Sequence, residues 1–180
     1  MRTFIAVEIP EKERKPIWTL ITEQKKKNLP IKWVEFQNLH ITLKFLGEID
    51  EKKLERMIPL LSTISGKTKS FKMSLENIGC FPGIRNPRVL WVGVIQGSDE
   101  LIKLAIDIEN ELYKIGIKKE EKKFHPHLTI GRIKTPCNVE DIISQPIKID
   151  EFDVKEFILF KSTLQPSGPI YEKLKKFPLL

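Results

Sequence analysis

Two hydrophobic periods alternate along this chain of 180 residues. Some stretches repeat apolar residues every three to four positions, as on the buried face of a helix. Shorter stretches repeat them at every second position, as in a half-buried strand. The first period predicts helices at 12–27, 50–66 and 98–116 and a short helix at 138–144. The second predicts strands at 3–9, 32–35, 38–45, 71–76, 88–95, 127–130, 152–160 and 169–174.

Helix ends and the order of the elements define a fold class. Asp50 and Ser98 are expected to cap the second and third helices, since side-chain oxygens there accept hydrogen bonds from free backbone amides. The strict strand–helix alternation of a doubly wound parallel sheet is missing. We therefore predict an α+β fold with antiparallel sheets. At 180 residues the chain is expected to form one domain, 1–180, with two lobes.

Composition narrows the class of protein. No run of about 18 apolar residues exists, so no membrane span is expected. The N-terminus enters an amphipathic strand without a signal-peptide pattern, which predicts a cytoplasmic protein. Cys80 and Cys137 are the only cysteines and are expected to be reduced thiols. The net charge of +7 favours an anionic partner such as RNA without requiring one, and nothing demands more than a monomer.

One short motif occurs twice. The sequence His40-Ile-Thr42-Leu recurs 87 residues later as His127-Leu-Thr129-Ile, and two of the three histidines fall in it. On a strand, the histidine and the threonine of each copy point to one face and the aliphatic residues to the other. Two imidazoles can act as acid and base, and two hydroxyls can donate hydrogen bonds to phosphate oxygens. The repeat therefore indicates phosphoester chemistry rather than ordinary strand composition.

With these motifs the sequence resembles the two-histidine phosphoesterases. Within them it is similar to the RNA 2′,3′-cyclic phosphodiesterases, also called 2′-5′ RNA ligases. The similarity covers an opening strand, both motif blocks and a closing segment, at 2–10, 38–47, 126–132 and 161–171. These segments stand in the expected order and span essentially the whole chain.

The resemblance implies a fold and a reaction. Two pseudo-symmetric lobes, each with an antiparallel sheet flanked by helices, would place the motifs across a central groove. The substrate would be RNA ending in a 2′,3′-cyclic phosphate. His40 would donate a proton to the leaving O3′ and His127 would accept one from water, giving a 2′-phosphomonoester. Thr42 and Thr129 would bind phosphate oxygens, and no metal or cofactor is required. The residue types alone do not say which histidine is the acid.

Two basic residues beside the motifs are ambiguous. By resemblance Arg132 contacts the phosphate, but on a regular strand it would face away from His127. A bulge at Gly131 would turn it back, and a structural ion pair is the alternative. Lys44 shares the parity of His40 and so has a place in the groove, although a surface position is the commoner one for lysine.

Four other features have ordinary structural explanations. Phe45 and Trp33 offer rings that could stack on a base, but we expect both to be packed in the core. Tyr171 is expected near the groove from the last strands. The charge run Lys118–Lys123 is expected to be solvated surface.

Other functions stay open on the sequence alone. His125 and His127 have a spacing that a strand-borne metal site uses, with Cys137, His40 or a carboxylate as a third ligand, but Pro126 between them argues against it. A phosphodiesterase of small cyclic nucleotides and a non-catalytic RNA-binding module are the remaining alternatives. An RNA 5′-hydroxyl in place of water would give 2′-5′ ligation.

Overall fold

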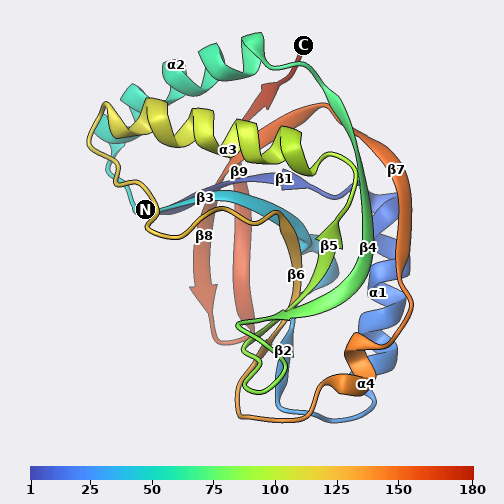
Figure 1. Cartoon of the computed structure of the whole chain (residues 1–180). Helices are drawn as coiled ribbons and strands as arrows, with labels where there is room; N and C mark the ends of the chain where they lie inside the picture. Colours follow the sequence, from blue (N-terminus) through green and yellow to red (C-terminus); the bar gives the residue numbers. More distant parts are fainter.

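The computed structural model describes residues 1–180, which form nine strands and four α-helices (Figure 1). In chain order these are β1 (Arg2–Glu8), α1 (Glu11–Lys25), β2 (Ile31–Trp33), the 3₁₀ turn η1 (Phe36–Asn38), β3 (His40–Glu48), α2 (Glu51–Lys67), β4 (Phe71–Phe81), β5 (Val89–Val94), α3 (Ser98–Tyr113), β6 (His127–Ile133), α4 (Glu140–Ile143), β7 (Lys148–Val154), β8 (Glu156–Gln165) and β9 (Gly168–Pro178). None of the helices is both long and apolar enough to cross a membrane.

The strands form two antiparallel sheets, which confirms the predicted α+β class. The first sheet has the order β3-β1-β8-β9 and the second β2-β6-β5-β4-β7. Each sheet contains one motif strand, β3 or β6. The order β3-β1-β8-β9 corresponds to β6-β5-β4-β7, with β2 added at the edge beyond β6. The two lobes are therefore pseudo-symmetric.

The two lobes do not coincide with the two halves of the chain. The first sheet combines β1 and β3 with the C-terminal strands β8 and β9, whereas β4 from the first half lies between β5 and β7 in the second sheet. The region 152–160 was predicted as one strand, and this is wrong. It contains the end of β7, which pairs with β4, and the start of β8, which pairs with β1 and β9. Buried apolar residues stand on both sides of Lys155 and Glu156, and two polar residues do not by themselves indicate a change of sheet.

Helices cover the outer faces of the sheets. Helices α2 and α3 lie side by side on the first sheet, where α3 contacts β3 and α2 contacts β9 (Figure 1). Helix α4 contacts β4 of the second sheet, and α1 lies at that end of the molecule (Figure 1). One continuous core of 35 buried residues joins both sheets and the helices. A smaller cluster of Phe4, Ala6, Ile158 and Phe160 lies on the opposite face of the first sheet.

The two predicted helix caps have different outcomes. Asp50 caps α2 as predicted, since its Oδ1 accepts a hydrogen bond of 2.7 Å from the backbone amide of Lys53. The prediction of Ser98 as the cap of α3 is wrong. Gly97 occupies the capping position with φ of 87° and no side-chain hydrogen bond. A Cβ at Gly97 would approach the carbonyl oxygen of Lys72 to 2.7 Å, so close packing on β4 requires glycine there.

Candidate active site

A single groove of about 1800 Å³ contains both motifs. It is lined from both sheets, from α3 and from the segment between α3 and β6. All five site residues predicted from the sequence line it: His40, Thr42, His127, Thr129 and Arg132. His40 and His127 are 87 positions apart in the chain, and they belong to one site because β3 and β6 lie beside each other.

Each motif imidazole is hydrogen-bonded to the backbone carbonyl of the residue two positions before it. Nδ1 of His40 lies 2.5 Å from the carbonyl oxygen of Asn38, and Nδ1 of His127 lies 2.6 Å from the carbonyl oxygen of His125. A carbonyl oxygen can only accept, so Nδ1 carries the hydrogen in each ring and Nε2 is left for chemistry. Sequence reasoning missed these carbonyl groups. The sequence indicates them only through their position, since each carbonyl belongs to the residue two positions before a motif histidine.

The threonines differ between the two copies. The Thr42 hydroxyl lies 3.0 Å from Nε2 of His40, within hydrogen-bonding distance. Nε2 of His127 has no such partner within the chain, and Thr129 is half-buried in the groove wall. The Thr42 hydroxyl can therefore bind either the imidazole or an incoming oxygen, whereas His127 presents a free nitrogen.

An aromatic ring packs edge-on against each imidazole. The Tyr171 ring lies 5.2 Å from that of His40, and the Phe81 ring lies 5.0 Å from that of His127, each at an interplanar angle of 87°. The expected approach of Tyr171 to the groove is therefore confirmed. Phe81 was missed because residues 80–87 read as a loop in the sequence, whereas β4 continues through Phe81. The two rings limit the tilt of the imidazoles.

A β-bulge follows the threonine in both motif strands. The register of β1 with β3 passes from Thr42 directly to Lys44, and that of β5 with β6 passes from Thr129 directly to Gly131. Leu43 of β3 and Ile130 of β6 are thus unpaired at these bulges, and the parity of the next residues is inverted. Arg132 consequently faces the groove with the motif residues. The bulge considered at Gly131 is present but lies one residue earlier, at Ile130.

The bulge in β3 decides the positions of Lys44 and Phe45. Lys44 was expected in the groove or on the surface; it belongs to the groove lining but is not at the surface, since it is buried in the wall and only 2% exposed. Its Nζ lies 2.7 Å from Oε1 of Glu109 and 2.9 Å from the carbonyl oxygen of Lys118. Phe45 was expected to be buried, but it is 55% exposed in the groove. Trp33 is buried, as predicted.

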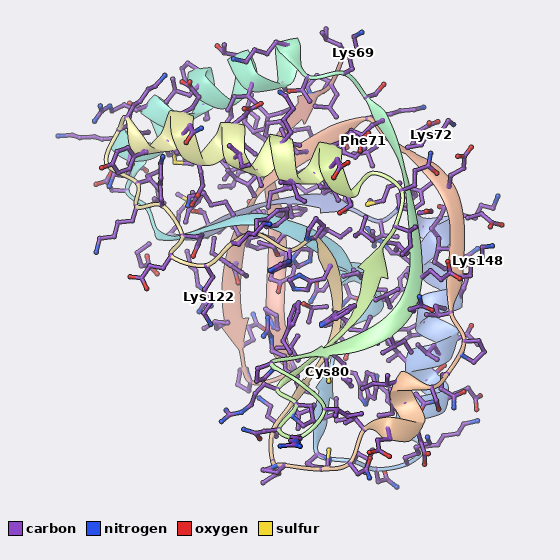
Figure 2. All side chains as sticks on the ribbon, viewed as in Figure 1. Lys69, Phe71, Lys72, Cys80, Lys122 and Lys148 are labelled. Atoms are coloured by element: carbon purple, nitrogen blue, oxygen red, sulfur yellow. The ribbon has the colours of Figure 1, made fainter.

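The segment between α3 and β6 forms one wall of the groove. Residues 118–123 are exposed, as predicted, but Glu120–Lys123 also line the groove, and Figure 2 marks Lys122 there. The segment is held from below because Oε1 of Glu109 accepts from the backbone amide of Glu120 at 2.5 Å. The pair of the buried Lys44 and the half-buried Glu109 therefore anchors the wall to β3 and α3.

Burial controls the charge of the imidazoles. Desolvation lowers the pKa of His40 from 6.5 to about 4, and the Asn38 carbonyl opposes this effect. Smaller contributions come from the charges of Arg14, Glu8 and Arg132. Desolvation also lowers the pKa of His127, again opposed by a backbone carbonyl. Both rings are therefore neutral at pH 7 in the ligand-free protein, and a bound phosphate anion would raise both pKa values.

This burial predicts acid sensitivity. Between pH 6.5 and 4 the unfolded chain protonates His40 whereas the folded chain does not, so the free energy of unfolding falls as the pH is lowered. The expected loss is about 3 kcal/mol at pH 4. Chemical denaturation across this range should show a shallower pH dependence in His40→Gln than in the parent protein. Equal slopes in the two proteins would contradict the prediction.

The metal alternative suggested by His125 and His127 lacks a ligand set. His125 is an exposed residue at the groove. No three His, Cys, Asp or Glu side chains are gathered so that they could hold a metal ion. Cys137 therefore does not supply the third ligand considered from the sequence.

The groove brings together two imidazoles, two threonine hydroxyls and a guanidinium. These are the groups that phosphoester chemistry needs, so the fold and the site define a phosphoesterase. Comparison with known proteins makes this specific. The chain belongs to the LigT like phosphoesterase family, whose model matches residues 7–91 and 92–171. Each matched segment contains one of the two motifs.

Relatives of known name and structure are similar over almost their whole length. Proteins named RNA 2′,3′-cyclic phosphodiesterase include one from Methanocaldococcus jannaschii, 41% identical over 98% of this chain and 100% of its own, and one from Thermotoga maritima, 38% identical over 97% and 93%. A crystal structure from Thermus thermophilus has a TM-score of 0.85 at 31% identity, covering 99% of this chain and 98% of that one. E. coli LigT complexed with 3′-AMP has a TM-score of 0.80 at 28% identity, covering 99% and 97%.

Proposed function

We propose that this protein is an RNA 2′,3′-cyclic phosphodiesterase that hydrolyses terminal cyclic phosphates to 2′-phosphomonoesters. One observation carries the proposal: two imidazoles from different sheets lie in one groove, each with Nδ1 bound to a backbone carbonyl. Acid and base on separate walls suit an in-line displacement, in which water enters and the alkoxide leaves on opposite sides of phosphorus. The names of the relatives support RNA as the substrate.

In the proposed reaction His127 accepts a proton from water through Nε2. The water oxygen attacks phosphorus, the P–O3′ bond breaks, and His40 protonates O3′. Thr42, Thr129 and Arg132 bind the non-bridging oxygens as negative charge builds on them. The assignment of His40 as donor comes from the family resemblance. An RNA 5′-hydroxyl in place of water would form a 2′-5′ linkage with the same groups.

The low pKa of His40 is compatible with this role once substrate is bound. A proton donor must enter the reaction as imidazolium, and the ligand-free ring is neutral at pH 7. The cyclic phosphate brings a negative charge into a partly desolvated groove, where Coulomb attraction favours the imidazolium form. Substrate and proton are therefore expected to bind His40 cooperatively.

The proposal extends to the working form of the protein. We propose that residues 1–180 act as one bilobal domain, because one buried core joins both sheets. A monomer suffices, because a single chain completes the groove. Cytoplasmic action on RNA is supported by the two free cysteines, which suit a reducing compartment.

The direct test is an oligoribonucleotide with a 2′,3′-cyclic phosphate end, incubated with the protein in EDTA. A 2′-phosphate product is expected. A 3′-phosphate product would reverse the direction of ring opening and the donor assignment. Turnover that requires added Zn²⁺ would establish the metal alternative, and RNA binding without turnover would establish the binding module. A much higher kcat/KM for adenosine 2′,3′-cyclic phosphate than for the oligonucleotide would favour a small-nucleotide enzyme.

A further inference from the structure

We propose that Asn38 is a positioning residue for His40, which it holds through its backbone and its side chain together. The backbone carbonyl of Asn38 binds the imidazole, and the side-chain amide ties that carbonyl to strand β9. The inference rests on the proposed function, because it takes His40 as one of the two imidazoles that move protons. It assigns to Asn38 a role in the reaction that is exerted only through His40.

The first observation is that Asn38 makes two hydrogen bonds in a buried place. Nδ1 of His40 donates to its backbone carbonyl oxygen at 2.5 Å. Its own Nδ2 donates to the carbonyl oxygen of Pro169 at 3.0 Å, across 131 positions of the chain. Asn38 is only 6% exposed, and a buried amide without its partner would destabilise the protein. The side chain therefore stays bound to β9 and keeps the carbonyl at the imidazole.

The second observation is that this bond links the segment before one edge strand of the first sheet to the other edge strand. β3 and β9 are the outer strands of that sheet, with β1 and β8 between them. The two edges nevertheless meet at His40, because Tyr171 of β9 packs its ring against the imidazole at 5.2 Å. Tyr171 follows Pro169 by two positions. Asn38 therefore connects the carbonyl that binds the imidazole to the strand whose aromatic ring packs against the same imidazole.

The third observation concerns the start of the turn η1, which ends at Asn38. The guanidinium of Arg14 lies over the Phe36 ring at 5.7 Å, and its Nη1 donates to the Phe36 carbonyl at 3.5 Å. An ion pair of 3.1 Å with Glu8 orients this guanidinium. Arg14 thus holds the start of the turn and the Asn38 side chain holds its end, which leaves little freedom for the carbonyl that binds His40.

The two motif imidazoles differ in this respect. The carbonyl that binds His127 belongs to His125, an exposed residue without such a side-chain bond to another strand. The carbonyl that binds His40 is fixed from β9. Rotation of the His40 ring would carry Nε2 away from the oxygen that it serves, and a misplacement of about 1 Å can lower a rate by about 10²-fold. Loss of the Asn38 amide is therefore expected to lower kcat and to leave KM nearly unchanged.

A double-variant cycle tests whether Asn38 acts through His40. Asn38→Leu keeps the backbone carbonyl and the approximate shape of the side chain but removes the amide donor. With the cyclic-phosphate oligonucleotide it should lower kcat roughly 10- to 100-fold and change KM by less than about twofold. In a protein that already carries His40→Ala, the same substitution should change kcat by less than about twofold. An equal loss in both backgrounds would indicate a general disturbance of the groove and overturn the proposal, as would an unchanged kcat in Asn38→Leu.

A matched control separates positioning from the mere loss of a buried amide. Gln24 of α1 is 5% exposed and lies outside the groove. Gln24→Leu makes the same kind of exchange, a buried amide for an apolar side chain, and should keep the kcat and KM of the parent protein. A loss of kcat in Gln24→Leu as large as that in Asn38→Leu would overturn the proposal.

A second measurement reads the imidazoles without turnover. In the NMR spectrum of the ligand-free protein, Asn38→Leu should move the Nδ1–H resonance of His40 upfield, as for a weaker hydrogen bond, and leave that of His127 in place. An unchanged His40 resonance would overturn the proposal. If the parent protein turns over no cyclic phosphate, the proposed function fails, and the His40 resonance alone then decides whether Asn38 positions the imidazole.

Discussion

Replacing either motif histidine with alanine is expected to lower kcat by about 10²- to 10⁴-fold, the usual contribution of a positioned acid or base. The loss should fall on kcat rather than KM, because the imidazoles move protons while Thr42, Thr129 and Arg132 hold the phosphate. Initial rates with the cyclic-phosphate oligonucleotide measure it. His125→Ala is a suitable control, since it keeps the backbone carbonyl that holds His127 and removes only an exposed side chain. A loss below about tenfold in His40→Ala or His127→Ala would contradict acid–base catalysis by that residue.

A change of leaving group assigns the two roles. With sulfur in place of O3′, the departing thiolate needs no proton, so a variant without the acid should regain much of its relative rate. We expect this rescue in His40→Ala and its absence in His127→Ala. The opposite pattern would assign the acid to His127.

Removing the carboxylate of Glu109 is expected to destabilise the protein by about 3–5 kcal/mol, because it leaves the buried ammonium of Lys44 without its anion. For a chain of this size the midpoint of thermal unfolding should fall by about 10 °C. Glu109→Ala tests this by calorimetry at pH 7. The exposed pair Lys103–Asp107 on the same helix provides the control, and Asp107→Ala should cost at most about 1 kcal/mol. Similar shifts for the two variants would contradict the prediction.

The double variant Lys44→Met/Glu109→Leu separates stability from the anchoring of the groove wall. Exchanging both members of a buried ion pair for apolar residues is often neutral, so most of the lost stability should return. The bonds from Lys44 to the Lys118 carbonyl and from Glu109 to the Glu120 amide remain lost. The wall of residues 118–123 is then untied from its base. We expect Glu109→Ala to have a higher KM than the parent protein. The KM of the double variant should stay as high, although its unfolding midpoint recovers.

The repeat His-x-Thr predicted which side chains lie on the same face of each strand, because strand parity is a local property. His40, Thr42, His127 and Thr129 line one groove, as the pattern indicated. The simple alternation of strand faces no longer holds three residues after each histidine, because a bulge inverts it there. A bulge depends on the register with the neighbouring strand, β1 or β5, and that register is not visible in one strand alone. For this reason Lys44 is buried in the groove wall, whereas Phe45 and Arg132 are exposed in the groove.

The second feature that the sequence did not predict is the arrangement of segments far apart in the chain. Apolar residues from Phe152 to Phe160 are interrupted only by Asp153, Lys155 and Glu156, and two polar residues in a row do not by themselves show that the chain changes sheet. Likewise the charge run 118–123 is polar, and the sequence does not show whether it lines the groove or lies elsewhere on the surface. Only the buried pair beneath it, formed by residues 65 positions apart, brings it to the groove.

The exchange of strands between the lobes has a consequence for synthesis on the ribosome. The first motif strand is complete by residue 48, but β1, its neighbour, lies against β8, which begins at residue 156. A nascent chain that has already made both histidines therefore still lacks half of the first sheet. The distance between the two imidazoles is defined only when the C-terminal strands β8 and β9 have been added. Contacts of such long sequence separation form slowly, so catalytic competence should appear late in folding, in one step and not in two halves.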